Sequence, residues 1–287
     1  MCISNLPRLM LALLFVLLQG CGGSDSAEET EALVSIDPDN PPLTNGSWYR
    51  PAPSVSWQWQ LLGSVNSVYD VEIYDIDLFD VSASFIQQLQ LDGHKVICYF
   101  SAGSYEDWRD DVADFAPEDL GDTLDGWADE RWLDIRSANV LEIIKRRLDL
   151  AVTKGCDGVE PDNMDGYANA SGFTLSFEDQ LAYNRQIANE AHRRGLAVGL
   201  KNDLDQIPGL VAYFDFAVNE QCFEYAECDA LSAFIDAGKA VLNAEYKVEF
   251  QIDDNTRNAL CTDANARAFS TLVLPLDLDD SLRFSCL

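Results

Sequence analysis

The sequence predicts a single (β/α)8 barrel, the TIM barrel of α/β proteins, over residues 54–287. Short apolar segments alternate with longer amphipathic ones along this stretch, which is typical of a parallel sheet with crossover helices. Eight of the short segments qualify as strands, and about 250 residues is the usual length of such a barrel. A doubly wound open sheet is the alternative, but no glycine-rich dinucleotide loop follows the first strand.

The expected strands are short apolar runs that end in polar or glycine-containing segments. In chain order they are residues 56–61, 68–74, 95–100, 155–160, 197–201, 214–219, 240–246 and 270–274. A long insert between the third and fourth strands contains Trp108, Trp127 and Trp132. These tryptophans either line a glycan groove or pack the insert, and the sequence leaves both open.

Two of the expected helices have readable ends. One begins after Ser137, a favourable N-cap, carries one apolar stripe and ends before Gly155. The other begins after Ser176 with two acidic residues in its first turn, and basic residues precede Gly195 at its end. The helix dipole favours both arrangements of charge.

The first residues are expected to be a leader that is not part of the fold. Arg8 precedes an apolar run over residues 9–18, which is too short for a transmembrane helix but suits a signal-peptide core. The run ends in Leu-Gln-Gly-Cys, which resembles the bacterial lipoprotein box, so residues 1–20 are the expected signal and Cys21 the lipidated residue. An ordinary signal peptide is the alternative. Residues 21–53 are polar and are expected to form a flexible tether.

Six further cysteines follow the leader: Cys98, Cys156, Cys222, Cys228, Cys261 and Cys286. Export to an oxidising compartment allows such residues to pair, although spacing alone does not establish the connectivity. We expect the third and fourth to close one loop and the last two to hold the C-terminal segment. The first two lie inside apolar strand patterns, so we expect buried thiols there.

The charge of the chain is strongly one-sided. It has 49 acidic against 19 basic residues, a formal net charge of −30. A field of this sign repels nucleic acid and anionic lipid and attracts cations, including cationic polymers. Solubility alone is the alternative explanation for the charge.

Carboxylates gather where the expected strands end, which is the default place for an active site in such a barrel. They are Asp75, Glu160, Asp162 and Glu220 at strand ends, with Glu245 inside the seventh strand. No Ser/His/Asp or Cys/His arrangement is visible, because both histidines lie on or beside expected helices. Two carboxylates across a sugar ring are what glycoside hydrolysis needs, and crowding helps one to stay protonated near neutral pH.

Six motifs follow one another between about Trp48 and Tyr246. They are WQWQL at residues 57–61, YDID at 74–77, WLDIR at 132–136, CDGVEPDNMDGY at 156–167, GLKN at 199–202 and VNEQC at 218–222. In content and order they resemble glycoside hydrolase family 114, the endo-α-1,4-polygalactosaminidases and their relatives. The resemblance implies a TIM-barrel glycosidase.

By this resemblance the catalytic pair falls on Asp162 and Glu220. Glu160 shares a strand face with Asp162, if the strand extends that far, and is the alternative nucleophile. We expect Asp162 to be the nucleophile because it lies nearer the barrel mouth, and Glu220 to be the acid and base. Retention of configuration is the favoured outcome.

Seven further residues are expected to bind substrate: Asp75, Tyr99, Glu160, Asn163, Tyr167, Lys201 and Glu245. Structural roles are the alternatives. An interior ion pair would explain Asp75 and Lys201 equally well, and packing would explain the two tyrosines. Asp162 as a turn cap, and Glu220 as a hydrogen-bond partner of the loop that follows it, are further alternatives.

We therefore expect an endo-acting α-glycosidase that cleaves a galactosamine-containing polysaccharide and works as a monomer without cofactor or metal. A glycan with free, cationic amines would suit an acidic cleft. The other expected partner is a membrane, which the protein contacts through the lipid anchor only. We expect no binding to nucleic acid. The main rival is a non-catalytic glycan-binding lipoprotein on the same barrel. A metal-dependent deacetylase is disfavoured by the lack of metal-ligand patterns, since neither histidine lies near a cysteine pair.

Overall fold

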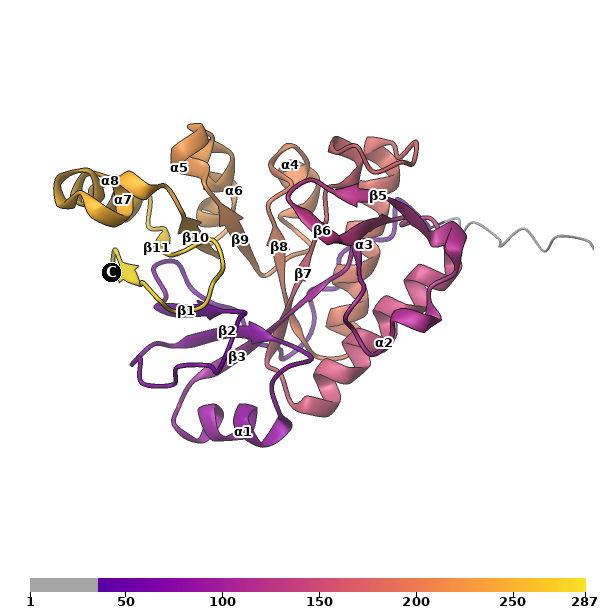
Figure 1. Ribbon diagram of the computed structural model, residues 1–287, viewed down its shortest axis with the longest axis horizontal. Helices are drawn as coiled ribbons and strands as arrows, with labels where there is room; N and C mark the ends of the chain where they lie inside the picture. Colours follow the sequence, from indigo (N-terminus) through magenta and orange to yellow (C-terminus); the bar gives the residue numbers. More distant parts are fainter. Residues whose placement is uncertain (1–35) are drawn as a thin grey trace, which may run out of the picture. The chain divides into compact units, whose positions relative to one another are not determined.

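The computed structural model describes residues 36–287, which form a barrel-like parallel sheet covered by helices (Figure 1). Eight parallel strands are hydrogen-bonded in chain order, and the short antiparallel strand β12 (Phe284–Ser285) follows the eighth. The parallel strands are β1 (Trp57–Gln60), β2 (Ile73–Asp77), β3 (Lys95–Ser101), β7 (Gly158–Asp162), β8 (Ala197–Lys201), β9 (Phe216–Glu220), β10 (Ala240–Glu245) and β11 (Ser270–Val273). All eight correspond to predicted strands.

Two of these strands lie further along the chain than we predicted. The second was expected over 68–74 and the fourth over 155–160, whereas β2 begins at Ile73 and β7 at Gly158. Val68 is 80% exposed in the loop before β2, and Gly155 adopts a left-handed conformation where the preceding helix ends. The shift makes Asp77 and Asp162 the last residues of their strands.

The first and eighth strands face each other across a seam. Among residues 36–287 no backbone ladder joins β1 to β11, and side chains cross the gap instead. The indole nitrogen of Trp57 donates to the carbonyl of Ser270 at 2.7 Å. Arg283 donates to the carbonyl of Trp57 at 2.8 Å and to Gln58 Oε1 at 2.6 Å, so the C-terminal segment covers the seam.

Helices occupy most of the connections between the parallel strands. They are α1 (Ala83–Leu91), α2 (Ala138–Lys154), α3 (Phe177–Arg193), α4 (Ile207–Leu210), α5 (Cys222–Tyr225), α6 (Ser232–Asp236), α7 (Val248–Ile252) and α8 (Asp254–Ala266). The connection from β1 to β2 contains no helix, which departs from an ideal eightfold barrel. Both predicted N-caps are confirmed: Ser137 accepts a hydrogen bond from the Val140 amide, and Ser176 accepts one from the Asp179 amide.

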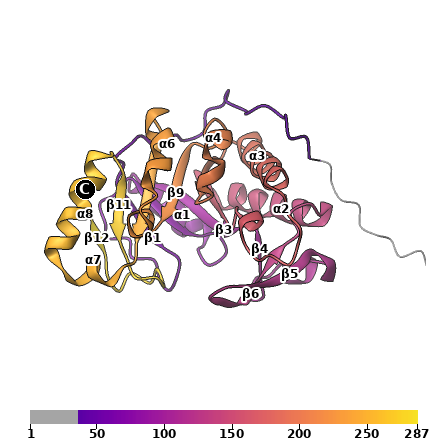
Figure 2. The ribbon, with the colours of Figure 1, turned by 90° about the horizontal axis from the view of Figure 1, so that it is seen from above.

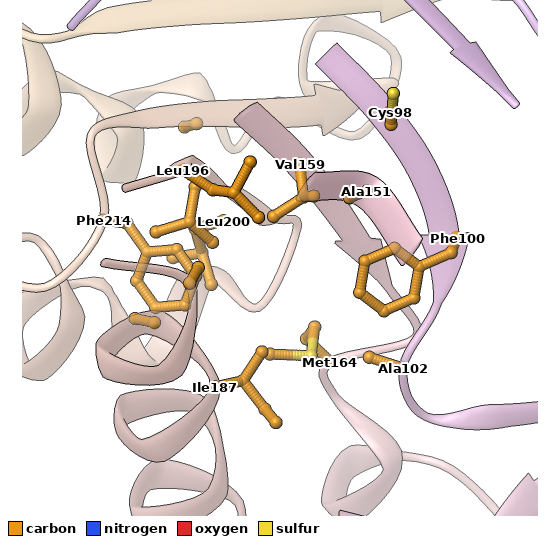
Figure 3. Close-up of a cluster of buried hydrophobic side chains, with 14 of the residues drawn as sticks. Cys98, Phe100, Ala102, Ala151, Val159, Met164, Ile187, Leu196, Leu200 and Phe214 are labelled. Atoms are coloured by element: carbon orange, nitrogen blue, oxygen red, sulfur yellow. The ribbon is translucent and has the colours of Figure 1, made fainter. Parts of the chain in front are cut away.

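Apolar side chains form two layers because successive residues of a strand point to opposite faces of the sheet. Trp57, Phe216 and Leu242 belong to the cluster inside the barrel. Figure 3 shows part of the outer cluster, where Val159 of β7 lies opposite Ile187 of α3. The helices therefore bury the outer face of the sheet.

The insert after β3 holds a small antiparallel sheet that we did not predict. Its strands are β4 (Ser104–Glu106), β5 (Leu120–Leu124) and β6 (Trp127–Leu133), paired in the order β4-β6-β5. Within β6 only Glu130, Trp132 and Leu133 are buried, so the sequence carries a weak strand pattern there. Figures 1 and 2 place this sheet on the opposite side of the barrel from α7 and α8.

Three disulfides cross-link the described part of the chain: Cys98–Cys156, Cys222–Cys228 and Cys261–Cys286. The second and third are the bridges we predicted. The first corrects our expectation of two buried thiols. Because β3 and β7 are neighbours in the sheet, residues 58 positions apart in the sequence lie with their Cα atoms only 6.1 Å apart.

Residues 36–53, which we predicted to end the tether, contact the barrel. The backbone amide of Leu43 donates to Asn189 Oδ1 at 2.9 Å. Trp48 stacks on His192 with ring centroids 4.0 Å apart and donates to Asp215 at 2.8 Å. These contacts fasten the segment to α3 and to the loop before β9.

The signal peptide over residues 1–20 and the lipidation of Cys21 lie outside the described residues. The domain boundary at residue 54 stays a prediction. Within residues 36–287, no helix is both long enough and apolar enough to cross a membrane.

Candidate active site

A cleft of about 560 Å³ opens at the carboxyl ends of the parallel strands, which is the end that carries the active site in TIM-barrel enzymes. Six strand ends contribute a polar or aromatic residue to it: Trp59, Asp77, Tyr99, Asp162, Lys201 and Glu220. The insert lines the cleft through Trp108, Trp127 and Trp132, of which the first two are exposed and the third is buried. Residues 276–278, between β11 and β12, also line it.

Lys201 lies at the centre of the cleft and bridges the two predicted catalytic carboxylates. Its Nζ is 3.0 Å from Asp162 Oδ1 and 3.0 Å from Glu220 Oε2. The lysine side chain is 4% exposed and sits 5.2 Å from the ring centre of Trp59. Because both oxygens contact one nitrogen at 3.0 Å, they are at most about 6 Å apart.

Strand register explains why these side chains meet. Asp162 is paired with Ser101 and Lys201 is paired with Val218, so β3, β7, β8 and β9 end close to one another. Side chains two residues apart point to the same face of a strand. Glu220 therefore points into the barrel with Val218, next to Lys201.

Asp162 is held by three donors. The Tyr99 hydroxyl donates to Oδ2 at 2.9 Å, the Asn163 amide donates to Oδ1 at 2.7 Å, and Lys201 donates to Oδ1. Burial, reinforced by the negative charge of Asp162, raises the pKa of Tyr99 well above its usual value, so the phenol stays protonated. The carboxylate is thus fixed in orientation at the cleft floor.

Glu220 has a matching set of donors. Its Oε1 accepts from the Tyr246 hydroxyl at 2.5 Å, and its Oε2 accepts from Asn202 Nδ2 at 3.2 Å and from Lys201. Asn202 Oδ1 also accepts a hydrogen bond from the backbone amide of Glu220 at 2.9 Å. None of these contacts is to the loop closed by Cys222 and Cys228, the structural alternative for Glu220.

Asp75 and Glu160 form a fully buried carboxyl pair deeper in the barrel than Lys201. Both are 0% exposed, and neither lines the cleft. No described group donates a hydrogen bond to any of their four oxygens, and each carboxyl group shifts the pKa of the other, so the two lie in contact. Two carboxyl groups in such contact need a proton between them.

Burial and the neighbouring Asp75 raise the pKa of Glu160 well above its usual value, while the charge of Lys201 opposes the rise. Burial also raises the pKa of Asp75 to about 7, opposed by the contact with Glu160 and by Lys201. Glu160 therefore holds the shared proton at neutral pH. The interior ion pair of Asp75 with Lys201 is not formed within 4.0 Å, whereas Glu160 Oε1 lies 3.8 Å from Nζ.

The other expected substrate-binding residues divide into two groups. Tyr99, Asn163 and Lys201 line the cleft. Tyr167 does not; its ring packs edge-on against Phe177 at 5.5 Å. Glu245 is 0% exposed and accepts a hydrogen bond from the Phe223 amide at 2.9 Å, so it lies behind the site.

Several cleft residues escaped the sequence analysis. Arg109 joins Asp77 and Glu106 at 2.7 and 2.6 Å, and Asp77 would have been found had the end of the second strand been placed three residues later. Tyr246 directly follows β10, as a barrel-end residue should. Glu130 has no equivalent signal in the sequence, because its position depends on the unexpected sheet of the insert.

The described residues include no group of three or more His, Cys, Asp or Glu side chains arranged to hold a metal ion. The ionisable side chains that line the cleft are carboxylates, a lysine, an arginine and a phenol.

The model of glycoside-hydrolase family GH114 matches residues 38–287. The chain belongs to this family. It is therefore a glycosidase, as the motifs predicted. No curated protein sequence matches the chain at a significant level.

Solved structures support the same fold. Ega3 of Aspergillus fumigatus, crystallised in complex with galactosamine, is 43% identical, with a TM-score of 0.81 over 86% of this chain and 100% of that chain. The glycoside hydrolase domain of PelA from Pseudomonas aeruginosa is 14% identical, with a TM-score of 0.64 over 80% and 98%. The α-galactosidase TtGalA of Thermus thermophilus is 10% identical, with a TM-score of 0.52 over 78% and 58%. The predicted TIM barrel is confirmed.

Proposed function

We propose that this glycosidase cleaves α-1,4-linked, galactosamine-containing polysaccharide within the chain, using Asp162 and Glu220. The observation that carries the proposal is the Asp162–Lys201–Glu220 bridge at the floor of the cleft. Membership of the family and the 43% identity to Ega3, crystallised with galactosamine, support the substrate.

In this mechanism the carboxylate of Asp162 attacks the anomeric carbon while Glu220 protonates the departing glycosidic oxygen. Glu220 then removes a proton from water, which attacks the anomeric carbon and releases Asp162. Asp162 is better placed than Glu160 for the first step, because Asp162 lines the cleft whereas Glu160 is 0% exposed and lies against Asp75.

The spacing of the two carboxyl groups supports retention of configuration. Retaining glycosidases hold them about 5–5.5 Å apart, whereas inverting enzymes leave about 6.5–9.5 Å for a water molecule. Through Lys201, the nearest oxygens of Asp162 and Glu220 are at most about 6 Å apart. That limit leaves little room for an intervening water.

Lys201 and the two phenols position the pair. The ammonium group offsets the repulsion between two carboxylates that share a cleft, and its three donors can hold both. Tyr99 holds the second oxygen of Asp162, and Tyr246 holds the second oxygen of Glu220. Neither carboxylate can therefore rotate without breaking a hydrogen bond.

The charge of the cleft supports a cationic glycan. Nine of its lining residues are acidic and two, Arg109 and Lys201, are basic. Such an excess attracts a polymer whose amino groups are free and protonated. Endo action fits a cleft with the insert on its edge, because Trp108 and Trp127 are 53% and 50% exposed and offer flat faces to further sugars.

The proposal is tested by incubating the protein with partly deacetylated α-1,4-galactosamine polysaccharide and sizing the products. We expect a ladder of oligosaccharides with the α configuration retained by NMR. Asp162→Asn and Glu220→Gln should each fold and lose about 10³-fold or more in kcat. Asp125→Asn, an exposed carboxylate that also lines the cleft, is the matched control. Binding of the glycan without any cleavage would establish the non-catalytic alternative.

Export and lipid anchoring form the second part of the proposal. The lipoprotein box at residues 18–21 and the polar segment behind it support a barrel tethered to a membrane surface by lipid on Cys21. Cys21→Ser should move the protein from the membrane to the soluble fraction after cell lysis. A variant that stays with the membrane would contradict the anchor.

A further inference from the structure

Glu130 differs from the other fully buried carboxylates of the cleft. Asp77, Glu106 and Glu130 are 5%, 2% and 9% exposed, and all three line the cleft. Arg109 pairs with the first two at 2.7 and 2.6 Å. Within the described part of the chain, no lysine, arginine or histidine lies within 4.0 Å of Glu130. A buried carboxylate normally has a cation, so a positive partner is missing here.

Hydrogen bonding fixes the direction in which Glu130 points. Ser104 Oγ donates to Glu130 Oε2 at 2.6 Å. Ser104 has one hydroxyl proton to donate, and the neighbouring Asn163 Oδ1 accepts a hydrogen bond from Ser101 at 2.7 Å. Among residues 36–287 no group donates a hydrogen bond to Glu130 Oε1, and this oxygen is not fully enclosed by protein. This oxygen is available to a group in the cleft.

Glu130 lies close to the proposed reaction centre. Ser104 Oγ is 3.1 Å from Asn163 Oδ1, and Asn163 directly follows Asp162 in the chain. One hydrogen bond and a 3.1 Å contact through Ser104 Oγ therefore connect Glu130 to the residue next to the proposed nucleophile. A sugar attacked by Asp162 would have a substituent within reach of Glu130.

The electrostatic surroundings of Glu130 favour a cationic ligand. Burial raises its pKa to about 7, the hydrogen bond from Ser104 opposes the rise, Glu106 and Asp162 add to it, and the more distant Arg109 lowers it. An ammonium group at Oε1 would supply the charge that these neighbours lack. Binding such a group would favour ionised Glu130 and release its proton below pH 7.

We propose that Glu130 binds the protonated amino group of a galactosamine unit and thereby selects free amine over N-acetylated sugar. The proposal rests on the proposed function and names the sugar substituent that the same cleft recognises. An acetamido group is neutral, so it leaves the carboxylate unpaired in a dry site, and its bulk needs space that the ammonium does not. Selection would therefore arise both from attraction to the protonated amine and from the unfavourable free energy of placing a neutral acetamido group beside the carboxylate.

The test compares a de-N-acetylated α-1,4-galactosamine oligosaccharide with its fully N-acetylated counterpart. Glu130→Gln should lower kcat/KM for the amine substrate about 10- to 100-fold, which is the range for a lost charged hydrogen bond. The value for the N-acetylated substrate should change less than about threefold. Glu130→Asp keeps the charge and should restore part of the preference. Glu118→Gln, which changes an exposed glutamate of the insert that does not line the cleft, is the matched control.

Calorimetry makes the test independent of turnover. In the Glu220→Gln background, the amine oligosaccharide should release close to one proton on binding at pH 6, measured in two buffers of different ionisation enthalpy. Adding Glu130→Gln should abolish most of that release. Equal losses for both substrates, an unchanged proton count, or an equal effect of Glu118→Gln would overturn the inference. Lack of cleavage by the unmodified protein, with proton release intact, would overturn the proposed function alone.

Discussion

The buried pair of Asp75 and Glu160 leads to a prediction in which stability falls as pH rises. The double variant Asp75→Asn with Glu160→Gln replaces two carboxyl groups by two amides of nearly the same shape. At about pH 4 the natural pair is already neutral, so the free energies of unfolding should nearly agree. Above pH 7 the folded protein must ionise the buried pair, whereas the unfolded chain ionises freely. The natural protein should then be the less stable of the two.

The size of this difference follows from Asp75. Its pKa rises from 3.8 to about 7 on folding, which corresponds to roughly 4 kcal/mol at about 1.36 kcal/mol per unit. The pKa of Glu160 is raised as well and adds its own contribution, whereas Lys201 opposes both shifts, so we expect a gain of at least about 2–4 kcal/mol at pH 8. Urea unfolding of both proteins at several pH values between 4.5 and 8.5 measures it.

Parallel stability curves across that pH range would refute the shared-proton interpretation. Activity gives a second check through Glu160→Gln alone. The amide can donate to Asp75 and leaves the pair with one negative charge, so we expect kcat to fall less than about tenfold, since one hydrogen bond is exchanged for another. A loss as large as that of Asp162→Asn would instead make Glu160 the nucleophile.

Two further predictions concern the support of the catalytic pair. Lys201→Met removes the cation between two carboxylates, so it should lower kcat/KM at least about 100-fold and destabilise the fold by about 3–5 kcal/mol. Steady-state kinetics and urea unfolding measure the two effects. Near-normal turnover would contradict the bridging role of Lys201. Non-reducing peptide mapping should find Cys222 and Cys228 joined by a disulfide. Replacing both by serine should lower the free energy of unfolding by about 2 kcal/mol, the loop-closure value for so short a ring. Two free thiols in protein from an oxidising compartment would rule the bridge out.

Local patterns were enough for the architecture. Apolar runs and helix caps at Ser137 and Ser176 depend on neighbours a few residues away, so the eight strands and two long helices could be read directly. Strand limits were less certain because a strand begins where pairing begins. β2 was expected at residue 68 but starts at Ile73, where it pairs with Trp57 and Lys95.

The antiparallel insert escaped prediction for a related reason. Only part of β6 is buried, since its outer face is open to solvent, and the period-2 pattern of apolar residues is therefore broken by charged ones. The position of Glu130 in the cleft depends on this sheet. Disulfide Cys98–Cys156 was likewise hidden, because adjacent strands in the sheet are separated by the whole insert and α2.

The sequence by itself determined the fold class, the family and the two carboxylates at the ends of β7 and β9, because motif spacing and strand periodicity are local properties. Only the tertiary structure separated the roles of neighbouring carboxylates. Asp162 and Glu160 are two residues apart on one strand face, yet one accepts a hydrogen bond from Lys201 at the cleft and the other is buried against Asp75, which raises its pKa. That difference comes from depth in the barrel and from groups on other strands, which decide solvation and charge around each carboxyl group.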